Sequence, residues 1–165
     1  MGDNRRFQVF ASHIARNLPQ NSSKTSNIND ISVADVAGGK GYMRLALAEI
    51  GIKNVETWDK RHNYVPGKQK YGYFDYKTAP EYNYAIGMHL DEGTDQIIHY
   101  CGKWRVRGFI CPCCVKYSAR VYWGRNKYKD WKIHLEKLAN ELDLNVKWDR
   151  MNFNGKNDLM IVSPN

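Results

Sequence analysis

One segment restricts the fold of this chain more than any other, because an apolar run ends in a glycine-rich turn and continues into a helix. The run Ile31–Ala37 predicts a buried β-strand, and Tyr42–Ile50 predicts a helix that Gly51 ends. Between them, residues 38–41 read Gly-Gly-Lys-Gly. Glycine permits positive φ and lets a ligand approach the main chain closely. The segment therefore predicts a strand, a turn open to a ligand, and a helix.

Further strands and helices alternate along the rest of the chain. Strands are predicted at Val55–Trp58, Tyr73–Tyr76, Tyr82–Met88, Gly108–Pro112, Val146–Trp148 and Leu159–Val162, and helices at 5–18, Asp91–Tyr100 and 127–142. Residues 17–30 and 60–72 are predicted loops. The Asn-Gly pair at 154–155 predicts an antiparallel final hairpin. The alternation predicts a doubly wound, mostly parallel sheet with an antiparallel last strand, in three α/β/α layers.

The length of 165 residues fits one domain, with residues 1–30 as an N-terminal helix and loop and 31–165 as the core. A hydrophobic content of 42% argues against a disordered chain. No apolar run approaches the roughly 20 residues that span a bilayer, and no apolar stretch follows the charged start Met1–Arg6. We therefore expect a cytoplasmic protein. Its richness in Asn, Lys, Tyr and Ile is typical of an AT-rich genome, such as that of a phage or virus.

Basic residues outnumber acidic ones, 25 to 17, and the net charge is +8. This charge favours a polyanionic partner such as nucleic acid. The excess is dense in 116–137, where tyrosine and tryptophan are interleaved with the cations, as suits a surface that holds phosphates and stacks bases. The alternative, buried aromatics beside solvated lysines, stays open. The candidate nucleic-acid contacts are Lys116, Arg120, Arg125, Lys127 and Lys129.

Two later segments place reactive side chains where predicted strands end. Gly-Met-His-Leu-Asp at 87–91 contains His89 and Asp91, and Cys-Pro-Cys-Cys at 111–114 contains Cys113 and Cys114. Because adjacent parallel strands end on one edge, both segments should face one cleft. His89 could act as a general base or hydrogen-bond partner, or be structural. The cysteines could line the site, supply a thiolate or simply pack. Their spacing is not that of a usual zinc site, so no metal is predicted.

The run Asp-Val-Ala-Gly-Gly-Lys-Gly after an apolar strand resembles the first motif of class I S-adenosylmethionine-dependent methyltransferases, which have a Rossmann-like fold. The resemblance implies S-adenosylmethionine as cofactor, with the turn beneath its methionine part and ribose. It also implies that Asp59 accepts hydrogen bonds from the ribose hydroxyls and that Asp75 contacts the adenine amine. The implied cofactor-binding residues are Asp35, Ala37, Gly38, Gly39, Gly41, Asp59 and Asp75.

The Gly-x-His and Pro-Cys-Cys segments are together similar to those of a branch that includes tRNA ribose methyltransferases. That similarity covers roughly residues 30–115. The chain differs in having Leu90 after His89 and in lacking a histidine directly after Cys114. The 165 residues also do not include the larger RNA-binding and zinc-finger modules of such tRNA enzymes. The resemblance implies that His89, Asp91, Cys113 and Cys114 form the acceptor side of the site.

The function predicted from the sequence is S-adenosylmethionine-dependent methyl transfer, with RNA as the favoured substrate. Two alternatives stay open. The chain could methylate a protein or a small molecule, or it could be a catalytically silent binding module that keeps the methyltransferase fold.

Overall fold

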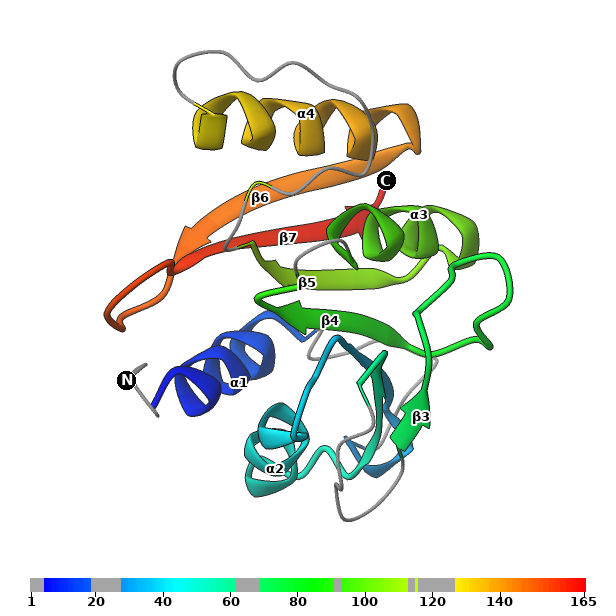
Figure 1. Ribbon diagram of the computed structural model, residues 1–165, viewed down its shortest axis with the longest axis vertical. Helices are drawn as coiled ribbons and strands as arrows, with labels where there is room; N and C mark the ends of the chain where they lie inside the picture. The colour runs from blue at the N-terminus through cyan, green and yellow to red at the C-terminus, as the bar shows by residue number, and fades with distance from the viewer. Residues whose placement is uncertain (1–4, 19–27, 62–68, 91–92, 113–114, 116–126) are drawn as a thin grey trace.

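The computed structural model describes residues 5–18, 28–61, 69–90, 93–112, 115 and 127–165. These residues contain a seven-stranded sheet in the order β3-β2-β1-β4-β5-β7-β6 (Figure 1). The strands are β1 Ser32–Val36, β2 Asn54–Asp59, β3 Gln69–Tyr71, β4 Tyr84–Met88, β5 Arg107–Cys111, β6 Leu144–Arg150 and β7 Asp158–Pro164. Strands β1 to β5 pair in parallel, whereas β7 runs antiparallel to both β5 and β6. The predicted mostly parallel sheet with an antiparallel last strand is confirmed.

Helices cover both faces of this sheet. They are α1 Arg6–Asn17, α2 Tyr42–Glu49, α3 Thr94–Trp104 and α4 Lys127–Glu141, and a short 3-10 turn spans Ile28–Asp30. The buried faces of α1 and α2 belong to one hydrophobic cluster, and those of α3 and α4 belong to another on the opposite face. The three predicted α/β/α layers are therefore present. No helix in this described part of the chain is long and apolar enough to cross a bilayer.

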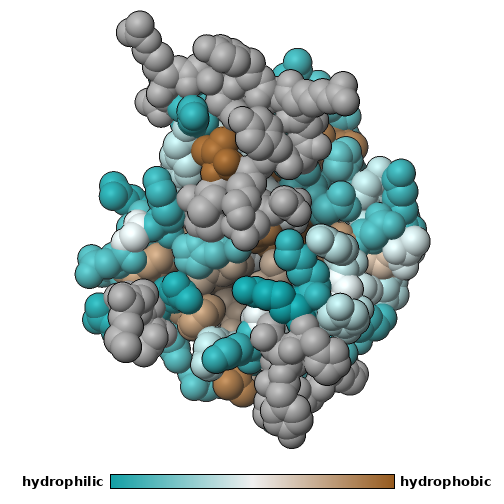
Figure 2. All heavy atoms as spheres, viewed as in Figure 1, coloured by the Kyte–Doolittle hydropathy of each residue, from teal (hydrophilic) through white to brown (hydrophobic). Residues whose placement is uncertain are grey.

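The central strand β1 is largely apolar because both of its faces are covered. Val33 packs into the α1 and α2 cluster, and Ala34 and Val36 pack into the α3 and α4 cluster. A strand between two helical layers has no solvated face, so its residues are largely apolar, and its one acid, Asp35, is buried as well. Hydrophilic side chains instead cover much of the described outer surface visible in Figure 2.

The order of the strands places a crevice beside β1. From β1 the chain adds β2 and β3 on one side, and it then crosses over to place β4 and β5 on the other. The helices that follow β1 and β4 leave on opposite faces of the sheet. Ligands of such sheets bind at this reversal, outside the carboxyl ends of the strands.

The third strand was wrongly predicted. It is Gln69–Tyr71, in the stretch expected to be a loop, and not Tyr73–Tyr76. It is an edge strand held by parallel pairing with β2, and it carries no apolar pattern that could reveal it. The aromatic signal at 73–76 has another cause: Phe74 is buried and packs edge-on against Trp58, with ring centroids 5.5 Å apart.

Other boundaries differ by a few residues. Helix α3 begins at Thr94 and continues to Trp104, beyond its predicted end. The last two strands are longer than predicted, and residues 151–157 join them in place of a tight two-residue turn. Met151 and Phe153 in this connection are buried against the α1 and α2 cluster. The longer connection therefore contributes to the core.

Helix α4 gives a test of the packing against the sheet. Leu135 is fully buried, whereas Ile133 on the same helix is 54% exposed. Leu135→Ala should lower the free energy of unfolding by about 2–5 kcal/mol because it leaves a cavity. Ile133→Ala should change it by less than about 0.5 kcal/mol. Urea unfolding of both variants measures this difference, and equal losses would contradict the packing described.

Candidate functional site

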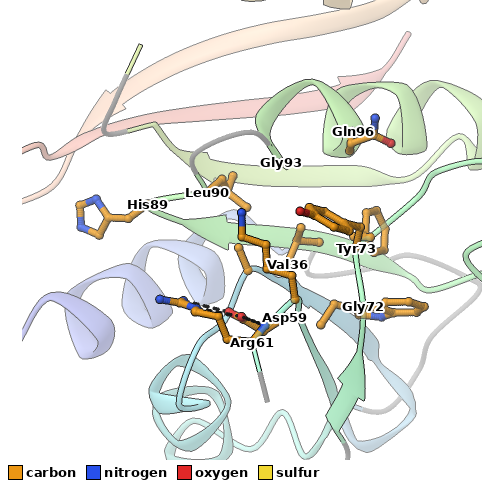
Figure 3. Close-up of a pocket in the computed structure, with 13 residues that line it drawn as sticks. Val36, Asp59, Arg61, Gly72, Tyr73, His89, Leu90, Gly93 and Gln96 are labelled. Carbon is orange, nitrogen blue, oxygen red and sulfur yellow. Dashed lines mark hydrogen bonds and ion pairs between the residues drawn. The ribbon is translucent and has the colours of Figure 1, made fainter. Parts of the chain in front are cut away.

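A pocket lies at the predicted crevice, where β1, β2 and β4 end (Figure 3). It encloses about 150 Å³. Its lining comes from the ends of β1, β2 and β4, the segment after β3 and the start of α3. The lining residues are Val36, Ala37, Trp58, Asp59, Lys60, Arg61, Gly72, Tyr73, Phe74, His89, Leu90, Gly93 and Gln96.

The acid of this pocket is Asp59, the last residue of β2, whose side chain is only 2% exposed. One carboxylate oxygen, Oδ2, accepts a hydrogen bond of 2.8 Å from the main-chain N–H of Gly39. The same oxygen accepts one from Arg61 Nη2 at 3.0 Å. The other, Oδ1, accepts bonds from Arg61 N at 2.8 Å and from Arg61 Nε at 3.0 Å. Asp59 thus joins the glycine turn to the end of β2.

These partners keep Asp59 ionised. Burial by itself would raise the pKa of the carboxyl, but the hydrogen bonds from the Arg61 side chain and main chain and from Gly39 together outweigh it, and the pKa lies below its usual range. Hydrogen bonds to the charged form of an acid favour that form. A buried anionic acceptor therefore stands at the floor of the pocket.

A second acid, Asp35, lies beneath the turn and is not part of the pocket lining. It is 1% exposed and accepts a hydrogen bond of 3.2 Å from Thr57 Oγ1. Burial is the main cause that raises the pKa of Asp35 to about 7, and the charge of Asp59 adds to it. A Cβ on Gly38 would lie 2.1 Å from Asp35 Oδ2 and 2.7 Å from Thr57 Cγ2. Only glycine fits above this acid.

The turn itself depends on left-handed backbone conformations. Ala37, Gly39 and Gly41 have φ of 55°, 57° and 71°. Gly41 is the N-cap of α2, and Leu45 N donates to its carbonyl oxygen at 3.2 Å. Helix α2 therefore starts directly from the turn, with the bare main chain of Gly39 facing Asp59 and Arg61.

At the end of β4 the chain turns sharply. His89 has φ of 59°, and its N–H donates to the Cys111 carbonyl oxygen at 3.0 Å. Leu90 then folds back over Gly87, where a Cβ would lie 2.1 Å from Leu90 Cδ2. In Figure 3, His89 lies at the end of the pocket away from Tyr73. Both His89 and Leu90 therefore reach the pocket from one turn.

The structure brings together some predicted site residues and separates others. Ala37, Asp59 and His89 line the pocket. The carboxylate of Asp75 instead accepts bonds from Lys77 N at 3.0 Å and Thr78 Oγ1 at 3.3 Å, within a turn outside the lining. Its predicted contact with adenine stays a prediction.

Several predictions lie wholly or partly outside the described residues. The predicted site residues that lie outside the described part of the chain are Asp91, Cys113, Cys114, Lys116, Arg120 and Arg125. The described cysteines, Cys101 and Cys111, are buried, and burial raises the pKa of Cys101. No group of three potential metal ligands occurs among the described residues, but two of the cysteines are not among them. The absence of a metal therefore also stays a prediction.

Sequence reasoning missed most of the residues that line the pocket. Among those it missed, Trp58, Tyr73 and Gln96 add aromatic and amide groups to the lining, and Arg61 pairs with Asp59. Trp58 was predicted only as part of a strand, and Gln96 only as part of a helix. The cation two residues after the acid was the one available signal for Arg61. Nothing in the local sequence indicates that Gln96, on α3, lies beside residues that follow β3.

No protein-family model matches this sequence, and no curated protein matches it by sequence. Solved structures do match its fold. A putative hemolysin from Lactococcus lactis has a TM-score of 0.70 at 12% identity, and the match covers 99% of this chain and 88% of that chain. Magnesium protoporphyrin IX methyltransferase (ChlM) from Synechocystis PCC 6803, with bound SAH, has a TM-score of 0.61 at 12% identity, covering 98% and 84%. A SAM dependent methyltransferase from Aquifex aeolicus has 0.58 at 12%, covering 98% and 93%.

The chain therefore has the Rossmann-like fold of S-adenosylmethionine-dependent methyltransferases. This agrees with the resemblance seen in the glycine motif. The finer similarity to tRNA ribose methyltransferases stays a prediction.

The buried acid Asp35 gives a prediction about pH. The unfolded carboxyl titrates near 4, and the folded one has a pKa of about 7. Between these values the folded state holds a proton that the unfolded state has lost, so the contribution of Asp35 to stability falls as pH rises. The expected fall is up to about 4 kcal/mol between pH 4 and pH 8.

Asp35→Asn should remove this fall. The free energy of unfolding of the variant, compared with that of the wild type, should therefore be more favourable at pH 8 than at pH 5. Urea unfolding at several pH values measures it. Asp143→Asn, which removes an exposed carboxylate instead of a buried one, is the control for the loss of one acidic group. Parallel profiles for the wild type and Asp35→Asn would show that Asp35 is ionised in the folded protein.

Proposed function

We propose that this chain is an S-adenosylmethionine-dependent methyltransferase that binds its cofactor in the pocket beside β1. One observation carries the proposal: the buried carboxylate of Asp59 lies against the bare main chain of Gly39, with Gly39 N and Asp59 Oδ2 2.8 Å apart. A carboxylate can accept two vicinal hydroxyls, and a glycine turn lets a nucleoside lie close to the backbone.

The residues around the pocket suit the parts of this cofactor. Trp58, Tyr73 and Phe74 provide aromatic surface for a flat base, and Leu90 adds aliphatic surface to the lining. Gln96 adds an amide there, and its Oε1 accepts from Tyr76 N at 3.3 Å. We therefore propose that Gln96, in place of Asp75, takes part in recognising the adenine ring. Asp59 would hold the ribose between this aromatic surface and the turn.

The bound sulfonium supplies an already activated methyl group, so the protein needs mainly to orient the acceptor. His89 lies at the end of the pocket away from Tyr73 and is fixed by its main-chain bond to Cys111. That position suits a side chain that contacts the acceptor and can take a proton from it. We propose this role for His89.

Calorimetric titration with S-adenosylhomocysteine tests the cofactor site. Asp59→Asn should weaken binding roughly tenfold or more, because a hydrogen bond to a charged acceptor is lost. Asp143→Asn, at an exposed acid paired with Arg105, is the matched control and should bind as the wild type does. Unchanged affinity in Asp59→Asn would remove Asp59 from the site.

We further propose RNA as the methyl acceptor. The net charge of +8 supports this, as do the exposed Lys127 and Lys129 in the first turn of α4. That turn lies at the carboxyl end of β5, since Tyr128 Oη donates to the Pro112 carbonyl oxygen at 3.4 Å. A strand of RNA held there would run along the sheet edge that carries the pocket. A small molecule is the competing acceptor, as the name of the protoporphyrin methyltransferase of similar fold suggests.

Charge reversal on α4 tests the RNA proposal. The double variant Lys127→Glu/Lys129→Glu should bind a single-stranded RNA more weakly, and the decrease in affinity should be largest at low salt. The slope of log affinity against log salt should become shallower by about 1 for each phosphate that the variant no longer binds. Lys53→Glu, at an exposed lysine after α2, is the control, because it changes the charge at its site by the same amount as each of the two α4 substitutions. No RNA binding by the wild type, with methyl transfer to a small molecule instead, would contradict the proposal.

A further inference from the structure

All acceptor positions of the pocket acid are taken in the structure. A carboxylate has about four lone-pair sites. Asp59 receives four hydrogen bonds, one from Gly39 N and three from Arg61 N, Nε and Nη2, at 2.8–3.0 Å. A ribose hydroxyl therefore has no acceptor on Asp59 until one of these donors leaves.

The four donors are not equally able to leave. The two main-chain donors, Gly39 N and Arg61 N, are fixed by the turn and by the end of β2. The two guanidinium donors belong to a side chain that is 66% exposed, whereas the Asp59 side chain is 2% exposed. Rotation of the Arg61 side chain into solvent frees one position on each carboxylate oxygen and leaves the backbone unchanged.

The guanidinium also occupies the surface that a nucleoside needs. A Cβ built on Gly39 would lie 3.5 Å from Arg61 Nη2, so the guanidinium lies directly over the bare turn. Figure 3 shows Arg61 extended beside Asp59 at the pocket. The pocket encloses about 150 Å³, which is below the roughly 300–1,000 Å³ typical of ligand sites. Removal of Arg61 from this surface would enlarge the pocket where the glycine turn faces it.

We infer that Arg61 is a latch on the cofactor site, and that two vicinal hydroxyls of the entering nucleoside exchange with its two guanidinium donors on Asp59. This inference rests on the proposed function. The exchange replaces two N–H donors by two O–H donors and keeps the main-chain bonds from Gly39 and Arg61. Part of the binding free energy of the nucleoside is therefore used to break the Arg61–Asp59 ion pair. Arg61 thus sets how tightly the site holds its cofactor and its product.

Calorimetric titration with S-adenosylhomocysteine distinguishes a latch from a supporting residue, because the two have opposite signs. Arg61→Met keeps the aliphatic stem and removes the donors, so a latch predicts roughly three- to tenfold tighter binding. Arg61→Lys, which cannot form the bidentate pair, should lie between Arg61→Met and the wild type. Equal or weaker binding by Arg61→Met would overturn the inference.

A matched control removes another arginine that pairs with an aspartate. Arg105 Nη2 lies 3.2 Å from Asp143 Oδ2, at the end of α3 and away from the pocket. Arg105→Met should leave the affinity for S-adenosylhomocysteine unchanged. In Asp59→Asn, where the ion pair no longer exists, addition of Arg61→Met should give much less tightening, as a double-mutant cycle measures.

Nitrogen NMR of the Arg61 Nε–H, assigned by its absence from the spectrum of Arg61→Met, separates the failure of this inference from the failure of the proposed function. The ligand-free protein should show this signal, and S-adenosylhomocysteine should shift or remove it. A wild type that binds the ligand while the signal stays unchanged overturns the latch alone. If neither the wild type nor Arg61→Met binds the ligand, the proposed function fails as well.

Discussion

The hydrogen bond from Gly39 N to Asp59 Oδ2 is the contact on which the site depends, because it joins the turn after β1 to the end of β2. It exists only if the turn can pass close above β2. Glycine at 38 makes that approach possible, since a Cβ there would overlap Asp35 and Thr57. The order of the strands sets where the crevice lies, and this hydrogen bond brings the glycine turn and the Asp59 carboxylate together in it.

The two acids beside the turn differ in their environments. Asp59 is held ionised by Arg61 and Gly39, while burial raises the pKa of Asp35 to about 7. Two ionised carboxylates this close would repel each other. A partly protonated Asp35 lowers that repulsion, so Asp59 can stay ionised without a second full negative charge beside it. Once the Arg61 side chain has left, as inferred above, a hydroxyl-rich ligand would meet one strong acceptor in the pocket.

Much of the fold could be predicted from the sequence, because β1, β4 and β5 are buried along nearly their whole length and leave clear apolar runs. The burial of β2 alternates instead, and Val55, Thr57 and Trp58 are residue types that favour a strand. The glycine turn could be predicted because it follows the apolar run of β1, and Asp59 because it ends β2. β3 could not, because main-chain pairing at the sheet edge holds it without an apolar pattern. The Arg61 contact and the place of Gln96 depend on side-chain geometry and on a helix distant in sequence, so neither leaves a local signal.

The most direct test of the central claim is a crystal structure of this chain grown with S-adenosylhomocysteine. The account predicts the adenosyl group in the pocket beside β1, with both ribose hydroxyls within hydrogen-bond distance of the Asp59 carboxylate and with the Arg61 guanidinium turned away. A nucleoside bound elsewhere, or lying in this pocket with its ribose turned from Asp59, would contradict it.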